Sequence, residues 1–526
     1  MVKFTFYNSL TKRLDELDID KSEKLNWYIC GPTVYDQAHL GHARTYLSFD
    51  IFQRIMAHYK IDLKTQMNIT DVDDKIIRRS QELGIDPMDL TEKETRAFFN
   101  HLRRLSCLEV DTVTEVSRFI KEILGLIYVL IQGGYAYESN GSVYFSIPKY
   151  LEKKLPFPLR PESINDDQLQ QGEFLSEKRD PRDFALWKAK KEGEPDSLTW
   201  ESDYGPGRPG WHTECVAMIL SNFDNDKGRI DCHFGGYDLL FPHHQNEIIQ
   251  ALAYFESSGL LSEEMMKDYE TLGKFWSKYF IHIGQLNDEE GKKMSKSVGN
   301  FIAVDDWKKD PEILRMLVIK HHYRSSVNWT EGLVKDLEQS HQFLYESMDH
   351  YYEWYNLAQR SQIGDQKETD ETKNDNLEQL QNEWFKFKEE LDQNLRNDFH
   401  IEKVWESYQN FTNSYNNLVI KLDLESPSTL KLLREIYGMS LGFWDEMGFK
   451  NLFNHSPLTS KRLYKDSSAS LVDLMINFRS KVRELAIKSK DREILKACDQ
   501  LRDVGLSDLG FKVKDINKSH SVWSLK

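Results

Sequence analysis

The pattern of apolar and chain-breaking residues between positions 26 and 74 most strongly limits the folds open to this 526-residue chain. The apolar run NWYIC, residues 26–30, predicts a short buried strand that a Gly-Pro pair ends. Residues 42–59 then carry apolar side chains at helical spacing, and residues 63–69 predict a second strand. A strand, loop, helix and strand in this order open a doubly wound α/β domain. We therefore expect ligand sites at the carboxyl ends of these strands.

The rest of the chain divides into segments of different character. The run GSVYFSI predicts a small antiparallel sheet, and polar and Gly/Pro-rich stretches follow it, so we interpret this region as an insertion. Long amphipathic helical patterns dominate after Asn328. The predicted fold is a Rossmann-like doubly wound parallel sheet of class α/β, with an inserted connective domain and a C-terminal α-helical bundle. The expected segments are the two halves of the α/β domain at 1–119 and 209–275, the insertion at 120–208, a junction at 276–330 and the helical region at 331–526.

Charge and composition restrict the class of protein. The net charge of −16 argues against a nucleic-acid partner, but residues 457–526 carry fifteen Lys and Arg against nine Asp and Glu. A local basic face of this kind is enough to contact a phosphate backbone. No apolar run reaches membrane-spanning length, and the N-terminus lacks the apolar centre of a signal peptide, so we expect a soluble cytoplasmic protein. Five scattered cysteines do not form a disulfide framework.

Two histidines begin the predicted helix. His39 and His42 are three residues apart, so their imidazoles lie on nearly one face of its first turn. A helix N-terminus offers unpaired N–H groups and a partial positive charge, which favour a phosphate. Gly41 removes a side chain where a nucleotide would approach closely. An HxxH pair alone is a weak signal, and more often incidental.

A lysine-rich loop near the end of the α/β region offers a second group of phosphate-binding residues. Lys293, Ser295 and Lys296 lie in a segment flanked by glycines. Taken alone, such a segment is more often a solvated charged loop. Together with the histidine pair it predicts ATP activation of an acid, because mobile lysines can neutralise a leaving pyrophosphate.

Cysteine, histidine and glutamate residues in the same region suggest a metal site. Pro242 suits the first turn of a helix, which places His243 and Glu247 on one face. Cys215 lies in another predicted helix, and Cys30 lies at the carboxyl end of the first strand. Two thiols, an imidazole and a carboxylate suit zinc. From spacing alone, a buried thiol remains the alternative for each cysteine.

These residues belong to a wider set of segments that resembles a known family. With His39–His42 and Lys293–Ser297, the set resembles the class I aminoacyl-tRNA synthetases, and within them the cysteinyl-tRNA synthetases. The tail segment Leu509-Gly510-Phe511 is similar to the ends of eukaryotic cytosolic members. The further matching segments, in chain order, are Cys30–Asp36, Asn68–Lys75, Arg208–His212, Phe241–His244 and His322–Ser325.

The resemblance implies an activity and its partners. Members activate L-cysteine with Mg-ATP to cysteinyl-adenylate and transfer the cysteinyl group to the 3′ end of tRNA-Cys. The resemblance implies that the helical region binds the anticodon and that zinc recognises the substrate thiol. It implies catalytic roles for His39, His42, Lys293 and Lys296, and ATP contacts from these four together with Gly41 and Ser295. It implies zinc on Cys30, Cys215, His243 and Glu247, and cysteine contacts from Gly31, Thr70, Trp211 and His243.

Some features leave alternatives open. His212, His233 and His244 fit either contacts around the metal and the adenylate or structural roles, and Gln245 replaces an acidic residue common in the family. Related ligases join cysteinyl-adenylate to an amino sugar, but the long helical extension argues against that acceptor. A non-catalytic tRNA- or zinc-binding relative would not need all of the residues above. The oligomeric state, monomer or homodimer, stays open.

Overall fold

The computed structural model describes most of the chain in two compact units. The first unit comprises Met1–Glu338 with Glu389–Ser407, and the second comprises Gln339–Lys388 with Tyr408–Lys526. Within the described ranges, no helix combines the length and apolar character needed to cross a membrane. The described residues are 3–17, 19, 24–153, 155–159, 176–223, 230–262, 264–265, 273, 275–294, 299–361, 371–452, 468–506, 511–515 and 521–525.

The first unit is built on a five-stranded sheet in which every neighbouring pair of strands is parallel. Its order is β11–β10–β3–β4–β5, so the chain progresses outward from β3 in one direction and later in the other. The carboxyl edge between β3 and β10 is therefore a topological switch point, where such sheets bind ligands. The strands are β3 (Leu25–Ile29), β4 (Leu63–Ile69), β5 (Thr112–Glu115), β10 (Ile230–Gly236) and β11 (Ser277–Ile283).

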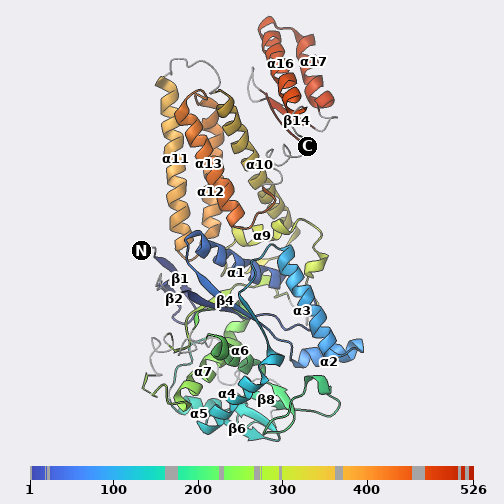
Figure 1. Ribbon diagram of the computed structural model, residues 1–526, viewed down its shortest axis with the longest axis vertical. Coiled ribbons are helices and arrows are strands. Elements are labelled where there is room, and N and C mark those ends of the chain that lie inside the picture. The colour runs from blue at the N-terminus through green and yellow to red at the C-terminus, as the bar shows by residue number, and fades with distance from the viewer. Residues whose placement is uncertain are drawn as a thin grey trace. The chain divides into compact units, whose positions relative to one another are not determined.

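Helices cover both faces of this sheet, as Figure 1 shows for α1 and α9 on one side and α6 and α7 on the other. The starts of α3 and α9 are set locally, because an aspartate caps each and a proline occupies the first turn. This arrangement confirms the predicted doubly wound α/β fold. The helices are α1 (Leu40–His58), α2 (Asp74–Leu83), α3 (Pro87–Arg104), α4 (Ile120–Gln132), α5 (Ile147–Glu152), α6 (Trp211–Asn222), α7 (Gln245–Ser257) and α9 (Pro311–Lys320).

The inserted region forms a separate antiparallel sheet but shares a hydrophobic core with the α/β domain. Its strands are β6 (Ala136–Ser139), β7 (Ser142–Phe145), β8 (Phe184–Ala189) and β9 (Gly207–Pro209), paired in that order. Asn140 and Gly141 both adopt positive φ, the backbone that a tight two-residue hairpin requires. Side chains of β7 and β8 lie in one buried cluster with those of α4, α6 and α7. The insertion therefore supports the helices that carry the site described below.

Short elements that the sequence patterns did not indicate complete this unit. An N-terminal hairpin pairs β1 (Phe4–Asn8) with β2 (Arg13–Leu17). The Ser9 N–H donates to the Phe280 carbonyl oxygen at 2.9 Å, which fixes this hairpin against β11. Two short parallel strands, β12 (Leu286–Asn287) and β13 (Val327–Asn328), pair beside the lysine-rich loop.

A buried ion cluster joins α1 to α9. The Arg315 guanidinium contacts the Asp50 carboxylate and donates to the Leu105 carbonyl oxygen at 2.7 Å, and both charged side chains are almost completely buried. Arg54 also pairs with Asp50, at 2.8 Å, so Arg315→Met would remove one of two cationic partners of this carboxylate. We expect a loss of about 1.5–3 kcal/mol in the free energy of unfolding, the usual contribution of a hydrogen bond to a charged group. Urea unfolding measures it. Arg79→Met, which removes an exposed pair with Glu82, should change stability by less than about 1 kcal/mol; equal losses would contradict the role of the cluster.

The second unit is helical, as expected, and aromatic side chains pack between its long helices. Ring pairs Tyr351–Tyr415, Phe387–Phe411 and Tyr352–Tyr437 join different helices with centroids 4.6, 5.5 and 5.3 Å apart. The helices are α10 (Glu331–Ser361), α11 (Glu371–Arg396), α12 (Ile401–Leu418), α13 (Pro427–Glu446), α16 (Ser468–Ser489) and α17 (Arg492–Gln500), of which α10, α11 and α12 begin or end in the first unit.

Two local expectations for the helical region need correction or completion. The polar segment 362–376 predicts a loop, but α11 begins at Glu371, because a polar composition does not exclude a helix and Glu and Lys are good helix formers. Residues 362–370 lie outside the described part of the chain. The chain also ends with a hairpin of β14 (Phe511–Asp515) and β15 (Ser521–Leu525) that the sequence patterns did not indicate. Of the tail segment 509–511, only the backbone of Phe511 is described.

Candidate active site and metal centre

The switch point of the sheet brings together side chains from four elements. Cys30 follows the last residue of β3, and His233 points from the neighbouring strand β10. Helix α6 supplies Cys215, and α7 with the turn before it supplies His243 and Glu247. All five residues are buried. The site therefore forms where the topology of an open α/β sheet favours ligand binding.

Four of these residues form a compact donor group whose possible ligand atoms all lie within 4.8 Å of one another. The two sulfur atoms of Cys30 and Cys215 are 3.9 Å apart, and Cys215 Sγ lies 3.6 Å from His243 Nε2. Glu247 Oε1 lies 2.9 Å from His243 Nε2 and 3.9 Å from Cys30 Sγ. Tetrahedral zinc with ordinary bond lengths would separate two sulfurs by about 3.8 Å and a sulfur from a nitrogen by about 3.6 Å. The donor set fits zinc in chemistry and spacing.

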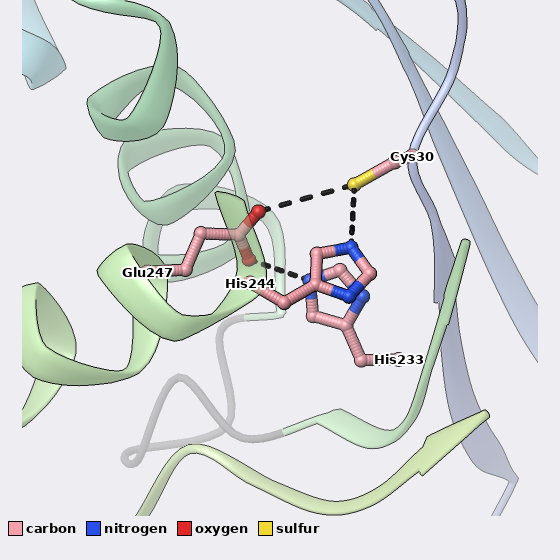
Figure 2. A group of neighbouring side chains, drawn as sticks. All are labelled: Cys30, His233, His244 and Glu247. Atoms are coloured by element: carbon pink, nitrogen blue, oxygen red, sulfur yellow. Dashed lines mark hydrogen bonds and ion pairs between the residues drawn. The ribbon is translucent and has the colours of Figure 1, made fainter. Parts of the chain in front are cut away.

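A second group of possible ligands overlaps the first, and Figure 2 shows it. It contains Cys30, His233, His244 and Glu247, with Cys30 Sγ 3.4 Å from His244 Nε2. In this group, His233 Nε2 lies 2.6 Å from Glu247 Oε2, so it holds the carboxylate oxygen that faces away from Cys30 and His243. A hydrogen bond from outside the donor group commonly orients a metal-binding carboxylate. The group with two sulfurs therefore fits zinc better in ligand chemistry, and the contact of His233 with Glu247 can orient that carboxylate.

The charges inside the site suit a cation. A hydrogen bond with Cys30, supported by His243, lowers the pKa of Cys215 to about 6 although burial opposes ionisation. Burial raises the pKa of the Cys30 thiol. Burial also raises the pKa of Glu247, but His233 and His243 outweigh it and hold that pKa well below its usual range. Burial opposes a charge on His243, but Glu247 and Cys215 raise its pKa to about 10. These directions favour a thiolate and a carboxylate, the ionised forms that a metal ion requires, and a bound metal would have to displace the proton of the His243 ring.

A chain of buried histidines extends behind the donor group. His244 Nδ1 lies 2.8 Å from His282 Nε2, and His282 Nδ1 lies 2.8 Å from Ser9 Oγ. On the other side, His212 Nδ1 lies 3.0 Å from His243 Nδ1. Burial lowers the pKa of His282 to about 3, so this ring is neutral. One of its nitrogens donates a hydrogen bond and the other accepts one. These contacts fix the orientation of the rings nearest the donors.

The residues expected around the substrate lie beside the donor group. Trp211 stacks on His243 with ring centroids 4.4 Å apart, and so covers one side of the site. Thr70 Oγ1 donates to the buried Glu214 carboxylate at 3.3 Å. Gly31, next to Cys30, donates its N–H to Asn68 Oδ1 at 2.8 Å. Their contact with a substrate remains a prediction.

Gly31 has no room for a side chain. A Cβ atom there would lie 1.6 Å from the Asn68 carbonyl oxygen, so Gly31→Ala must push the ends of β3 and β4 apart and move Cys30. A displacement near 1 Å at a reacting group can cost about 10²-fold in rate, and we expect a loss of that order in cysteine-dependent ATP–pyrophosphate exchange.

Gly125→Ala is the matched control for this change. Gly125 lies inside α4 with no atom within 4 Å of the added Cβ, so this variant should keep its activity. Equal activities of the two variants would contradict the close fit at Gly31.

The two expected phosphate-binding histidines cap α1 reciprocally. The His42 N–H donates to His39 Nδ1 at 3.3 Å, and the His39 N–H donates to His42 Nδ1 at 3.4 Å. The rings stack with centroids 3.8 Å apart. Because both Nδ1 atoms accept, each neutral ring carries its proton on Nε2, where it can donate to an anion. A Cβ on Gly41 would lie 2.9 Å from the His39 ring, so glycine is needed for this arrangement.

The chain that follows the lysine-rich loop lies against the start of α1. The Leu40 N–H donates to the Ile302 carbonyl oxygen, and the Val304 N–H donates to the Ala38 carbonyl oxygen, both at 2.9 Å. Within the loop, Lys293 Nζ forms an ion pair with Asp238 at 2.9 Å, just beyond β10. The two segments that are far apart in sequence therefore meet at one edge of the sheet. Ser295 and Lys296 lie outside the described residues.

Comparison with known proteins agrees with this geometry. The family model described as "tRNA synthetases class I (C) catalytic domain" matches residues 16–339. A cysteine–tRNA ligase of Methanococcus maripaludis is 34% identical over 527 residues, which cover 98% of each chain. The chain belongs to the cysteine–tRNA ligase family of class I tRNA synthetases.

Further relatives extend the similarity. A cytoplasmic cysteine–tRNA ligase of Dictyostelium discoideum is 34% identical over 96% of this chain and 75% of its own. A solved methionyl-tRNA synthetase of Mycobacterium tuberculosis superposes with a TM-score of 0.56 at 13% identity, covering 82% of this chain and 93% of that one. At that identity the second similarity concerns the fold alone.

Sequence reasoning missed several residues at this ligase site. It did not single out Glu214, whose pKa is raised by burial beside Thr70, although it is adjacent to Cys215. It also missed Asp238, the partner of Lys293, and the pair His282 and Ser9. A glutamate directly before a predicted metal ligand was a usable signal for Glu214. The other contacts depend on strand pairing that no local pattern indicates.

Proposed function

We propose that the chain is a cysteine–tRNA ligase that activates L-cysteine with Mg-ATP and transfers the cysteinyl group to tRNA-Cys. The similarity to ligases of that name over 98% of both chains is the observation that carries the proposal. Because the match includes the helical region, it favours a tRNA acceptor over the amino sugar of the smaller related ligases. The complete donor group favours an active enzyme over a binding protein.

Zinc is the proposed metal, and Cys30, Cys215, His243 and Glu247 would hold it. When bound, the ion would stabilise the substrate thiol as a thiolate, which the hydroxyl of serine cannot match. His233 would keep Glu247 oriented through the contact at 2.6 Å. Trp211, stacked on His243, would shield this region from water and form a wall of the cysteine pocket.

Activation requires positioning and charge neutralisation, with no covalent enzyme intermediate. The cysteine α-carboxylate attacks the α-phosphate of ATP, a new O–P bond forms, and pyrophosphate leaves. We assign the Nε2–H groups of His39 and His42 to the phosphates, with Gly41 allowing close approach. Lys293 and Lys296, with Ser295, would neutralise the β- and γ-phosphates. Lys293 must then exchange its Asp238 partner for a phosphate oxygen.

Gly31 and Thr70 are the proposed contacts to the amino-acid end of the substrate. Both lie next to the donor group, and the Thr70 hydroxyl is oriented by Glu214 at 3.3 Å. The helical region would bind the anticodon end of the tRNA, and the basic residues after position 457 would contribute phosphate contacts. A cytoplasmic location is proposed by analogy with the Dictyostelium relative.

Two assays test the proposal. L-Cysteine should support ATP–pyrophosphate exchange, and L-serine at equal concentration should support exchange at less than about 1% of that rate, beyond what one small group in an apolar pocket achieves. Adding tRNA with a GCA anticodon should then yield cysteinyl-tRNA. Exchange without aminoacylation would indicate another acceptor, and no exchange would indicate a binding protein.

A further inference from the structure

A cavity of about 280 Å³ lies between α1, α3 and the segment that leads into β5. Its walls are mainly apolar and include the aromatic residues Tyr46, Phe49 and Phe99. An apolar cavity of about 150 Å³ is enough to bind benzene, so this one has room for a two-ring molecule. None of the proposed catalytic or metal-binding residues lines it.

One polar group on the wall lacks a protein partner. Gln53 lies on the cavity wall with its side chain only 7% exposed. Among the described residues, none forms a hydrogen bond with its amide. The Gln53 amide is not among the fully buried side-chain atoms that lack a partner, so water can reach it through the cavity. A ligand that both donates and accepts a hydrogen bond would replace that water.

The charged groups of the cavity indicate a neutral ligand. The Asp50 carboxylate already binds Arg315 and accepts from the Leu108 N–H at 2.7 Å. Arg103 and Glu109 are exposed and opposite in charge, so neither sign is favoured at the cavity mouth. Aromatic walls favour a flat ring that can stack or meet them edge-on.

One side chain connects the cavity to the donor group. Tyr46 lines the cavity, and its hydroxyl donates to the Cys30 carbonyl oxygen at 3.2 Å. A ligand that moves this side chain would therefore move the hydrogen bond that holds the end of β3.

We propose that this cavity is a second ligand site, which binds a small, neutral, planar aromatic molecule carrying an amide-like edge and acts on the cysteine site through Tyr46. The amide edge pairs with Gln53, and the ring packs against Tyr46 and Phe49. The action on the cysteine site rests on the proposed function, in which L-cysteine binds at the donor group.

Calorimetric titration of the zinc-loaded protein with 2-naphthamide tests the binding site. Gln53→Leu should weaken 2-naphthamide about tenfold and leave 2-methylnaphthalene, which lacks the amide, unchanged. Val113→Trp, which fills the cavity from β5, should abolish the binding of both probes. Equal binding by the wild-type protein and both variants, or no binding at 2 mM, would overturn the site. Unchanged melting temperatures show that the variants are folded.

Linkage between the two ligands tests the action on the cysteine site. Saturating 2-naphthamide should change the Kd for L-cysteine at least about fivefold, and L-cysteine should change the Kd for 2-naphthamide by the same factor. If both ligands bind but neither affects the other, the coupling is overturned while the proposed function stands. If cysteine alone does not bind, the proposed function fails, and the binding experiment still decides the cavity.

Discussion

Replacing Cys215 by serine should lower kcat/KM for cysteine in ATP–pyrophosphate exchange by about 10³-fold, a loss of about 4 kcal/mol in transition-state stabilisation. Cys215 is the side chain with the lowered thiol pKa, about 6, and it lies within 4 Å of both Cys30 Sγ and His243 Nε2. A serine hydroxyl remains protonated at neutral pH and is a poor zinc ligand. The KM for ATP should change much less, because the phosphate-binding residues stay in place.

The zinc content of the variant shows whether the loss in kcat/KM results from the loss of the metal ion. Cys215→Ser should contain far less than one zinc ion per chain by atomic emission. Cys107→Ser is the matched control, since it removes a thiol outside the donor group and should keep full zinc and near-normal exchange. Full zinc occupancy and a normal KM for cysteine in Cys215→Ser would remove that residue from the site.

Replacing Lys296 by alanine should reduce the rate of adenylate formation by about 10²–10³-fold, the usual loss when one preorganised charge-stabilising group is removed from a transition state. The reason is the negative charge that builds on the leaving pyrophosphate. Zinc content and the KM for cysteine should stay near the wild-type values, because the donor group lies on other elements. ATP–pyrophosphate exchange at varied L-cysteine concentration measures the rate and the KM, and atomic emission measures the zinc content.

Lys292→Ala is the control for this variant. Lys292 lies in the same loop, is largely exposed and pairs with Glu290 at 2.6 Å. Its removal should change the rate less than about threefold, since exposed pairs contribute little. If the two variants lose the same activity, the effect belongs to loop charge in general and not to Lys296.

The elements that the sequence predicted best are those with strong local patterns. Strand β4 runs from Leu63 to Ile69 as predicted, and β3 and α1 begin within about a turn of their expected starts. The pairing of His243 with Glu247 also follows from a local rule, because residues four apart share a helix face. Each of these outcomes depends only on neighbours in the chain.

The rest depends on contacts between distant segments. Bringing Cys30 and Cys215 to within 3.9 Å requires the insertion to return the chain to the neighbouring strand, which spacing alone cannot reveal. The histidine chain ends on Ser9 because an N-terminal hairpin packs against β11. Lys293 meets Asp238 only after β10 and β12 are in place. Family resemblance supplied the donor residues, and the fold supplies the groups that orient them.

The most direct test of whether the metal binds the substrate thiol is zinc-edge X-ray absorption with and without L-cysteine. We expect two sulfur ligands at about 2.3 Å in the enzyme alone and three when L-cysteine is bound. L-Serine at saturation should leave the spectrum unchanged. A sulfur count that stays at two with bound L-cysteine would contradict the account and make the metal purely structural.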